Sequence, residues 1–127
     1  MKIGIISDIH SNIYAFKACT EYMEKHKCDE YFFLGDYISD TPYTRETMDY
    51  LYEFMEKLPG ALKPGGRVAI LTFHSGEDKL VKKALKAGYR EGVYSEYAKD
   101  VVRPSAEECA QNGRARSTKM RWAVKAE

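Results

Sequence analysis

Apolar residues recur along this chain in two patterns, which predict a series of strands and helices. Short β-rich apolar runs that end at polar residues or glycine are typical of strands, whereas apolar residues three and four positions apart indicate helices with one buried side. The first pattern predicts strands at 2–7, 31–34, 67–73 and 119–126, with an irregular one at 92–103. The second pattern predicts helices at 13–27, 44–58, 75–88 and 106–111.

The alternation of these elements predicts an α/β fold in a single domain of 127 residues. We expect a three-layer α/β/α sandwich, Rossmann-like, around a mostly parallel five-stranded sheet with one late antiparallel strand. The early strands should be parallel and joined by right-handed crossovers. The expected strand order is 1-2-3-5-4, and the residues expected to be buried in this sheet are Ile3, Ile5, Phe32, Leu34, Val68, Ile70 and Leu71.

Pro64, Gly65 and Gly66 interrupt the pattern just before the third predicted strand, because proline and glycine are poorly tolerated inside helices and strands. The charge also changes along the chain. Residues 1–57 carry 6 Lys/Arg against 11 Asp/Glu, a net charge of −5, and residues 58–127 carry 14 against 8, a net charge of +6. This asymmetry is typical either of a protein with an acidic face and a nucleic-acid-binding face, or of two halves with different origins.

The overall composition argues against several other classes of protein. Hydrophobic residues make up 44% of the chain and charged residues 31%, as in soluble globular domains. No apolar run is long enough to cross a bilayer, and the chain does not begin with the pattern of a signal peptide. The three cysteines show no paired spacing, which indicates reduced thiols. We therefore expect a cytoplasmic protein without a membrane partner.

Polar residues with metal-binding chemistry follow the first two predicted strands. Asp8 and His10 come directly after the first strand, and Asp36 comes after the second. Because the loops at the carboxyl ends of parallel strands line one crevice, these three side chains are expected to converge. Two carboxylates and an imidazole form a ligand set that suits Mn, Fe, Zn or Ni. The alternative is that Asp8 and Asp36 only cap their loops.

The stretches that contain these residues are ISDIHSN at 6–12 and LGDYISDTP at 34–42. In order and separation they resemble the amino-terminal motifs of the calcineurin-like metallophosphoesterases, and the resemblance covers residues 1–57. It implies that Asp8 and His10 bind one metal ion and that Asp36 bridges two. The family's later Asn-His pair and Gly-His-x-His motif do not occur. We therefore expect at most one weakly bound Mn or Zn ion and no phosphodiester hydrolysis.

The second half contains three ordered stretches, LKPGGRVAILTFHSGEDK at 62–79, VRPSAEE at 102–108 and NGRARSTKMR at 112–121. They make residues 58–127 resemble the carboxyl-terminal part of the MraW-type ribosomal RNA cytosine-amino methyltransferases. The resemblance implies a Rossmann-like fold that binds S-adenosylmethionine through a glycine-rich loop after the first strand. Here Asp8 and His10 occupy that position and no G-x-G-x-x-G follows the strand. No S-adenosylmethionine binding and no methyl transfer are therefore expected.

A basic run near the end of the chain is the candidate nucleic-acid surface. It consists of Arg114, Arg116, Lys119 and Arg121. Basic side chains bind the phosphates of RNA without reading its sequence. The alternative is an ordinary solvated loop and strand face, and the sequence leaves both interpretations open. Trp122, which lies on the last alternating strand, is expected in the core rather than as a platform for stacked bases.

Each resemblance covers an incomplete enzyme. Our leading hypothesis is an engineered or recombined chimera that completes one α/β domain from two fragments, requires no cofactor and has no catalytic activity. One alternative is a weak metal-binding phosphoesterase-like protein. Another is an RNA-binding methyltransferase fragment that makes a weak RNA contact through its basic carboxyl-terminal segment.

Overall fold

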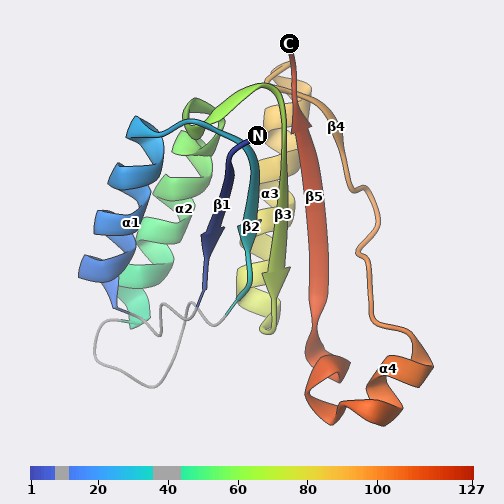
Figure 1. Cartoon of the computed structure of the whole chain (residues 1–127). Helices are drawn as coiled ribbons and strands as arrows, with labels where there is room; N and C mark the ends of the chain where they lie inside the picture. Colours follow the sequence, from blue (N-terminus) through green and yellow to red (C-terminus); the bar gives the residue numbers. More distant parts are fainter. Residues whose placement is uncertain (8–11, 36–43) are drawn as a thin grey trace.

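A computed structural model of the chain describes residues 1–7, 12–35 and 44–127. In these ranges the strands are β1 (Ile3–Ile6), β2 (Cys28–Phe33), β3 (Leu62–Thr72), β4 (Tyr94–Tyr97) and β5 (Lys119–Lys125). The helices are α1 (Ile13–Lys25), α2 (Thr44–Ala61), α3 (Ser75–Arg90) and α4 (Ala106–Gln111), with a 3-10 helix η1 (Gly113–Ser117). Figure 1 shows a Rossmann-like α/β fold, and the predicted class is confirmed.

The strands form one sheet in the order β1-β2-β3-β5-β4, which confirms the predicted order. β1 pairs parallel with β2, and β2 pairs parallel with β3. β5 runs antiparallel to both β3 and β4. The sheet is therefore mostly parallel with one late antiparallel strand, as the sequence predicted.

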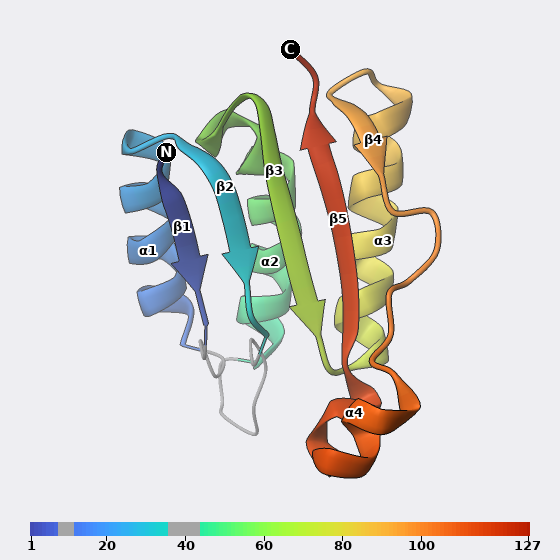
Figure 2. The same ribbon diagram turned by 45° about the vertical axis from the view of Figure 1, so that its right-hand side comes forward.

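The prediction of three layers is wrong for the described residues, because α1, α2 and α3 all lie on one face of the sheet (Figure 2). The strand order explains this difference. A right-handed crossover places its helix on a face that depends on the direction of the step between strands. The steps from β1 to β2, from β2 to β3 and from β3 to β4 all run in the same direction across the sheet. A second helical layer requires a reversal of that direction.

The core lies between the sheet and this single layer of helices. Phe16 of α1 and Phe54 of α2 pack with ring centroids 5.3 Å apart, and Phe54 packs on Phe33 of β2 at 4.9 Å. A buried hydrogen bond of 2.5 Å between the hydroxyl groups of Thr20 and Tyr50 also joins α1 to α2. The largest fully buried apolar side chains include Tyr31, Phe16, Phe33, Leu51, Leu58, Leu62, Ile70 and Leu85.

The missing layer changes which of the predicted core residues are buried. Val68 and Ile70 point toward the helices and are 1% and 2% exposed, as expected. In contrast, Ile3 is 51% exposed and Ile5 is 60% exposed, so the prediction that both are buried is wrong. Leu34 is also exposed, and Phe32 and Leu71 are half-buried.

Two predicted element boundaries are wrong at the connection from α2 to β3. α2 continues through Pro59, and β3 begins at Leu62 and contains Pro64 and both following glycines. The pairing of β3 with β2 is irregular there, because the register shifts between Cys28 and Glu30. The Pro-Gly-Gly stretch is therefore accommodated as a distortion of the strand.

The remaining elements follow the predictions closely. α4 has its predicted bounds, and α3 extends two residues past Gly88. The predicted irregular strand at 92–103 is reduced to β4 and an isolated bridge between Val102 and Met120. Within the described ranges, no helix has both the length and the apolar character that a membrane span requires.

Candidate nucleic-acid interface

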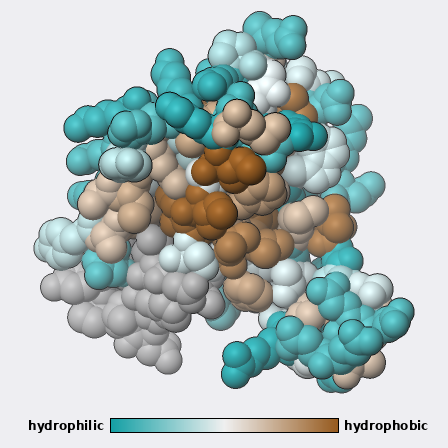
Figure 3. Space-filling view, in the orientation of Figure 1, coloured by the Kyte–Doolittle hydropathy of each residue, from teal (hydrophilic) through white to brown (hydrophobic). Residues whose placement is uncertain are grey.

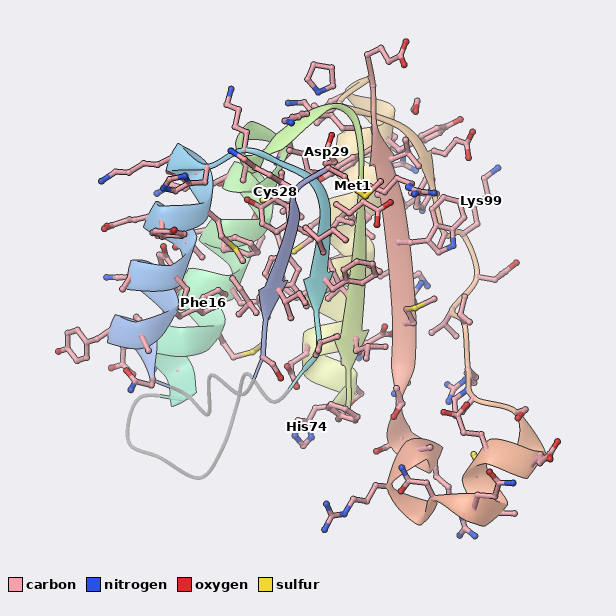
Figure 4. The ribbon with its side chains drawn as sticks, viewed as in Figure 1. Met1, Phe16, Cys28, Asp29, His74 and Lys99 are labelled. Atoms are coloured by element: carbon pink, nitrogen blue, oxygen red, sulfur yellow. The ribbon has the colours of Figure 1, made fainter. Side chains whose placement is uncertain are left out.

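The antiparallel direction of β5 determines where the basic segment lies. The first residue of β5, Lys119, pairs with Thr72 at the end of β3. The segment that precedes β5 therefore lies at the edge of the sheet where the parallel strands β1, β2 and β3 end. Figure 4 shows α4 and the neighbouring turn at this end of the molecule, where His74 also lies.

Residues 103–118 form a connection that contains α4 and η1, and both of its ends are attached to the sheet. The backbone groups of Val102 and Met120 exchange two hydrogen bonds of 2.9 Å. The side chain of Ser105 caps α4 by accepting a hydrogen bond of 3.1 Å from the N–H of Glu108. The Asn112 side chain accepts another of 3.1 Å from the N–H of Arg114 and starts η1.

Within η1, Ala115 is 8% exposed and anchors the turn. Its neighbours Arg114 and Arg116 are both exposed. Lys119 is half-buried at the start of β5. The structure thus brings Arg114, Arg116 and Lys119 into one short segment at one edge of the sheet. Two acidic residues, Glu107 and Glu108, are exposed in the adjacent α4, so the segment as a whole is moderately basic.

Arg121, the fourth predicted contact, is only 6% exposed and points toward α3. Its Nε donates a hydrogen bond of 2.7 Å to Oδ1 of Asp78, and its Nη2 donates one of 3.0 Å to Oδ2. This bidentate ion pair uses both oxygens of the carboxylate. The Arg121 guanidinium holds the pKa of Asp78 below its usual value, although burial acts in the opposite direction.

The ion pair joins the first turn of α3 to the strand that carries the basic segment. Asp78 is 9% exposed, and its backbone N–H donates a hydrogen bond of 3.1 Å to the carbonyl of His74. The position of β5 relative to α3 is therefore fixed close to Lys119. In this geometry Arg121 positions the basic segment, and its charge is already neutralised by Asp78.

Sequence reasoning missed the partnership between Asp78 and Arg121. A usable signal was present in the alternation of β5, which places Arg121 and Ala123 on one face and Trp122 on the other. Arg121 is buried and Ala123 is 0% exposed, whereas Trp122 is half-buried on the face without helices. An arginine on the helix-covered face requires a buried acid, and Asp78 in the first turn of α3 supplies it.

The predicted metal ligands Asp8, His10 and Asp36 lie outside the described residues, so their prediction stays a prediction. Among residues 1–7, 12–35 and 44–127, no cluster of three or more His, Cys, Asp or Glu side chains is arranged to hold a metal ion. Cys19, Cys28 and Cys109 are free thiols.

The fold and the site together define a Rossmann-like α/β protein with a basic segment at the carboxyl edge of its sheet. Comparison with protein families supports a more specific assignment. The chain belongs to the MraW methylase family, which it matches over residues 44–126. It also belongs to the calcineurin-like phosphoesterases, which it matches over residues 1–71. The two matches overlap at residues 44–71, which contain α2 and most of β3.

Several curated relatives resemble the methylase part. The "Ribosomal RNA small subunit methyltransferase H 1" of Agathobacter rectalis is 86% identical over 79 residues, which are 62% of this chain and 23% of that protein. The protein of the same name from Lachnoclostridium phytofermentans is 69% identical over 78 residues, which are 61% of this chain and 21% of that protein. The chain therefore spans less than a quarter of the length of these relatives.

Proposed function

We propose that this chain is a recombined, non-catalytic α/β protein whose methyltransferase-like part keeps a surface for the phosphate backbone of RNA. The observation that carries this proposal is the placement of Arg114, Arg116 and Lys119 in one segment that is attached at both ends to the sheet. The names of the relatives, ribosomal RNA methyltransferases, support RNA as the polyanion. We also propose a cytoplasmic location, which the names of these relatives support.

The recombination is supported by the two family matches on one chain. The boundary that we propose between the fragments, at residues 57 and 58, falls inside the overlap of the matches and inside α2. β2, which precedes the boundary, pairs with β3, which follows it, through the partners Tyr31–Val68 and Phe33–Ile70. In this proposal the phosphoesterase-like strands complete a sheet that the methyltransferase-like part cannot close alone.

The proposed lack of methyl transfer is supported by the residues at the cofactor position of the fold. The connection from β1 to α1, residues 7–12, contains no glycine, whereas a nucleotide-type cofactor requires close approach of the backbone there. In addition, the described crossovers all step in one direction, so the sheet has no switch point at which a crevice opens. These residues do not fit S-adenosylmethionine, and we derive no reaction through it.

The proposal assigns different roles to the four basic residues. Arg114 and Arg116 are exposed and would contact phosphates directly, and Lys119 would contribute a third charge next to them. Arg121 would act only as a positioning residue, because its guanidinium already donates hydrogen bonds to both carboxylate oxygens of Asp78. The contact would not discriminate between base sequences, since phosphate contacts carry no sequence information.

The test is a salt titration of RNA affinity, measured by fluorescence anisotropy with a labelled single-stranded RNA. The variant R114A/R116A/K119A should bind more weakly, and the slope of log K against log salt should fall by about 2, at about 0.7 for each lost phosphate contact. The matched control K83A/K86A/R90A also removes three positive charges, all of them exposed and all on α3. Its slope should remain close to that of the parent chain.

Two results would contradict the proposed function. One is an equal loss of slope in both triple variants, which would mean that RNA responds only to net charge. The other is a parent chain without measurable RNA affinity at low salt. All six substituted side chains lie outside the buried core, so both variants should keep the fold. Circular dichroism of each variant checks this.

A further inference from the structure

The sheet face opposite the three long helices is not covered by them, and it carries one apolar row and one row with two charged residues. Its residues follow from the strand register. One cross-strand row consists of Ile5, Phe32, Ala69 and Trp122, and all four residues are apolar. The adjacent row, one pleat further along, consists of Ile3, Glu30, Arg67 and Val124. We call these two rows together the open face.

Figure 3 shows apolar side chains gathered across the centre of the molecule on this side. Ile5 is 60% exposed, and Phe32, Ala69 and Trp122 are half-buried. A shallow hollow of about 620 Å³ lies over β2, β3 and β5 and is lined in part by Phe32, Ala69 and Trp122. Contiguous apolar patches larger than a few hundred Å² are rare on monomeric proteins and mark interaction sites.

We propose that the open face packs against the open face of a second copy of this chain, with a two-fold axis parallel to the strands and located between β2 and β3. This axis exchanges the two central strands and the two strands that flank them. It places Phe32 opposite Ala69 of the second copy, and Ile5 opposite Trp122 of the second copy. Each large side chain at the centre therefore meets a small one, as interdigitating sheets require.

The same axis makes the charged row complementary to itself. Glu30 and Arg67 already form an ion pair within one chain. In the dimer, Glu30 also faces Arg67 of the second copy, so acid and base alternate around the axis and no like charges meet. Ile3 faces Val124 of the second copy at the two ends of the row. The same two-fold rotation thus places apolar residues opposite apolar residues in one row and opposite charges together in the other. This self-complementarity favours a second copy over an unrelated partner.

The size of the open face agrees with this occupant. The axis superposes the four strands β1, β2, β3 and β5. At about 4.8 Å spacing and about 20 Å of strand length they cover a projected area of about 400 Å², and the accessible area of a side-chain surface exceeds its projection. A standard interface buries about 800 Å² per partner. Two sheets packed about 10 Å apart give a closed α/β/β/α arrangement with helices outside.

The test combines sedimentation equilibrium with the fluorescence of Trp122, which is the single tryptophan of the chain. The full chain is examined between about 1 and 500 µM, where interfaces of ordinary affinity dissociate. We expect a monomer–dimer equilibrium in which dilution shifts the Trp122 emission to longer wavelength. I5K should be monomeric across the range. The matched control Y52K adds the same charge to a residue of α2 that is 57% exposed, and it should still dimerise.

Each alternative result overturns the proposal. A monomer at the highest concentration excludes the dimer. A dimer whose formation leaves the Trp122 emission unchanged, or that persists in I5K, forms through another surface such as the free edge of β1. Loss of dimer in both variants would show that added charge alone prevents association. Thermal melts of I5K and Y52K verify folding, and a second variant of the open face, I3K, replaces I5K if it unfolds.

Discussion

Replacing Arg121 by Met should destabilise the protein strongly, because it leaves the Asp78 carboxylate buried without its partner. The side chains of Arg121 and Asp78 are 7% and 13% exposed. Removing one member of a buried ion pair costs about 3–5 kcal/mol. A domain of ordinary stability has about 5–15 kcal/mol in total. We expect the lower end, about 3 kcal/mol, since Asp78 keeps a small exposed area.

The assay is urea denaturation at pH 7, followed by far-ultraviolet circular dichroism because the substitution adjoins Trp122. With a slope of about 2 kcal/mol/M, a loss of 3 kcal/mol lowers the midpoint by about 1.5 M. K57M is the matched control. Lys57 pairs with Glu53 at 3.0 Å, but both side chains are about half exposed, so this loss should stay below about 0.5 kcal/mol.

The pH dependence gives a second readout. The guanidinium lowers the pKa of Asp78 in the folded chain below its unfolded value of about 3.9. The ion pair therefore stabilises the fold fully above that unfolded value, and the contribution is lost as the pH falls through the folded pKa. In R121M the guanidinium is gone and burial raises the pKa of Asp78 above its unfolded value. The difference between the parent chain and R121M should thus begin to shrink above about pH 4 and shrink further below it. A difference that is independent of pH, or a loss as small as in K57M, would refute this reasoning.

Two further predictions concern the core and the metal. I70A should lower the free energy of unfolding by about 2–5 kcal/mol in a denaturant melt, because Ile70 is 2% exposed. I5A should lower the free energy of unfolding of the monomer by less than about 0.5 kcal/mol, because Ile5 is 60% exposed. Equal losses in the two variants would contradict a core covered by helices on one face only. If Asp8, His10 and Asp36 converge, Mn should raise the thermal midpoint slightly and D8A should abolish the rise, which weakens as the pH falls because only neutral imidazole coordinates. A rise that persists in D8A would place the ion elsewhere.

The strand order could be predicted from the sequence, whereas the number of layers was predicted wrongly from the same information. Right-handed crossovers and the order 1-2-3-5-4 together place every crossover helix on one face. Ile3 and Ile5 were expected to be buried in the sheet and Trp122 was expected in the core, but all three lie on the face without helices. Periodicity alone does not identify which face the helices cover, since that depends on the direction of each crossover.

Long-range contacts explain why the end of α2 was mispredicted. Pro59 reads locally as a helix stop. In the structure, Nζ of Lys125 donates hydrogen bonds of 2.6 Å to the carbonyl of Pro59 and 2.9 Å to that of Leu62. A side chain more than 60 residues away thus satisfies one carbonyl in the last turn of α2 and one at the first residue of β3. The Asp78–Arg121 pair was missed for a similar reason, because its partners are 43 residues apart.

Hydrogen exchange measured under native conditions tests most directly whether the two family-matched parts share one fold. If β2 and β3 belong to one cooperative unit, the most protected amides of β1 and β2 should open with the same free energy as those of β3 and β5. That value should equal the global free energy of unfolding from the urea melt. Amides of β1 and β2 that open at a free energy lower by about 2 kcal/mol or more would contradict the account, because the phosphoesterase-like strands would then unfold separately from the methyltransferase-like part.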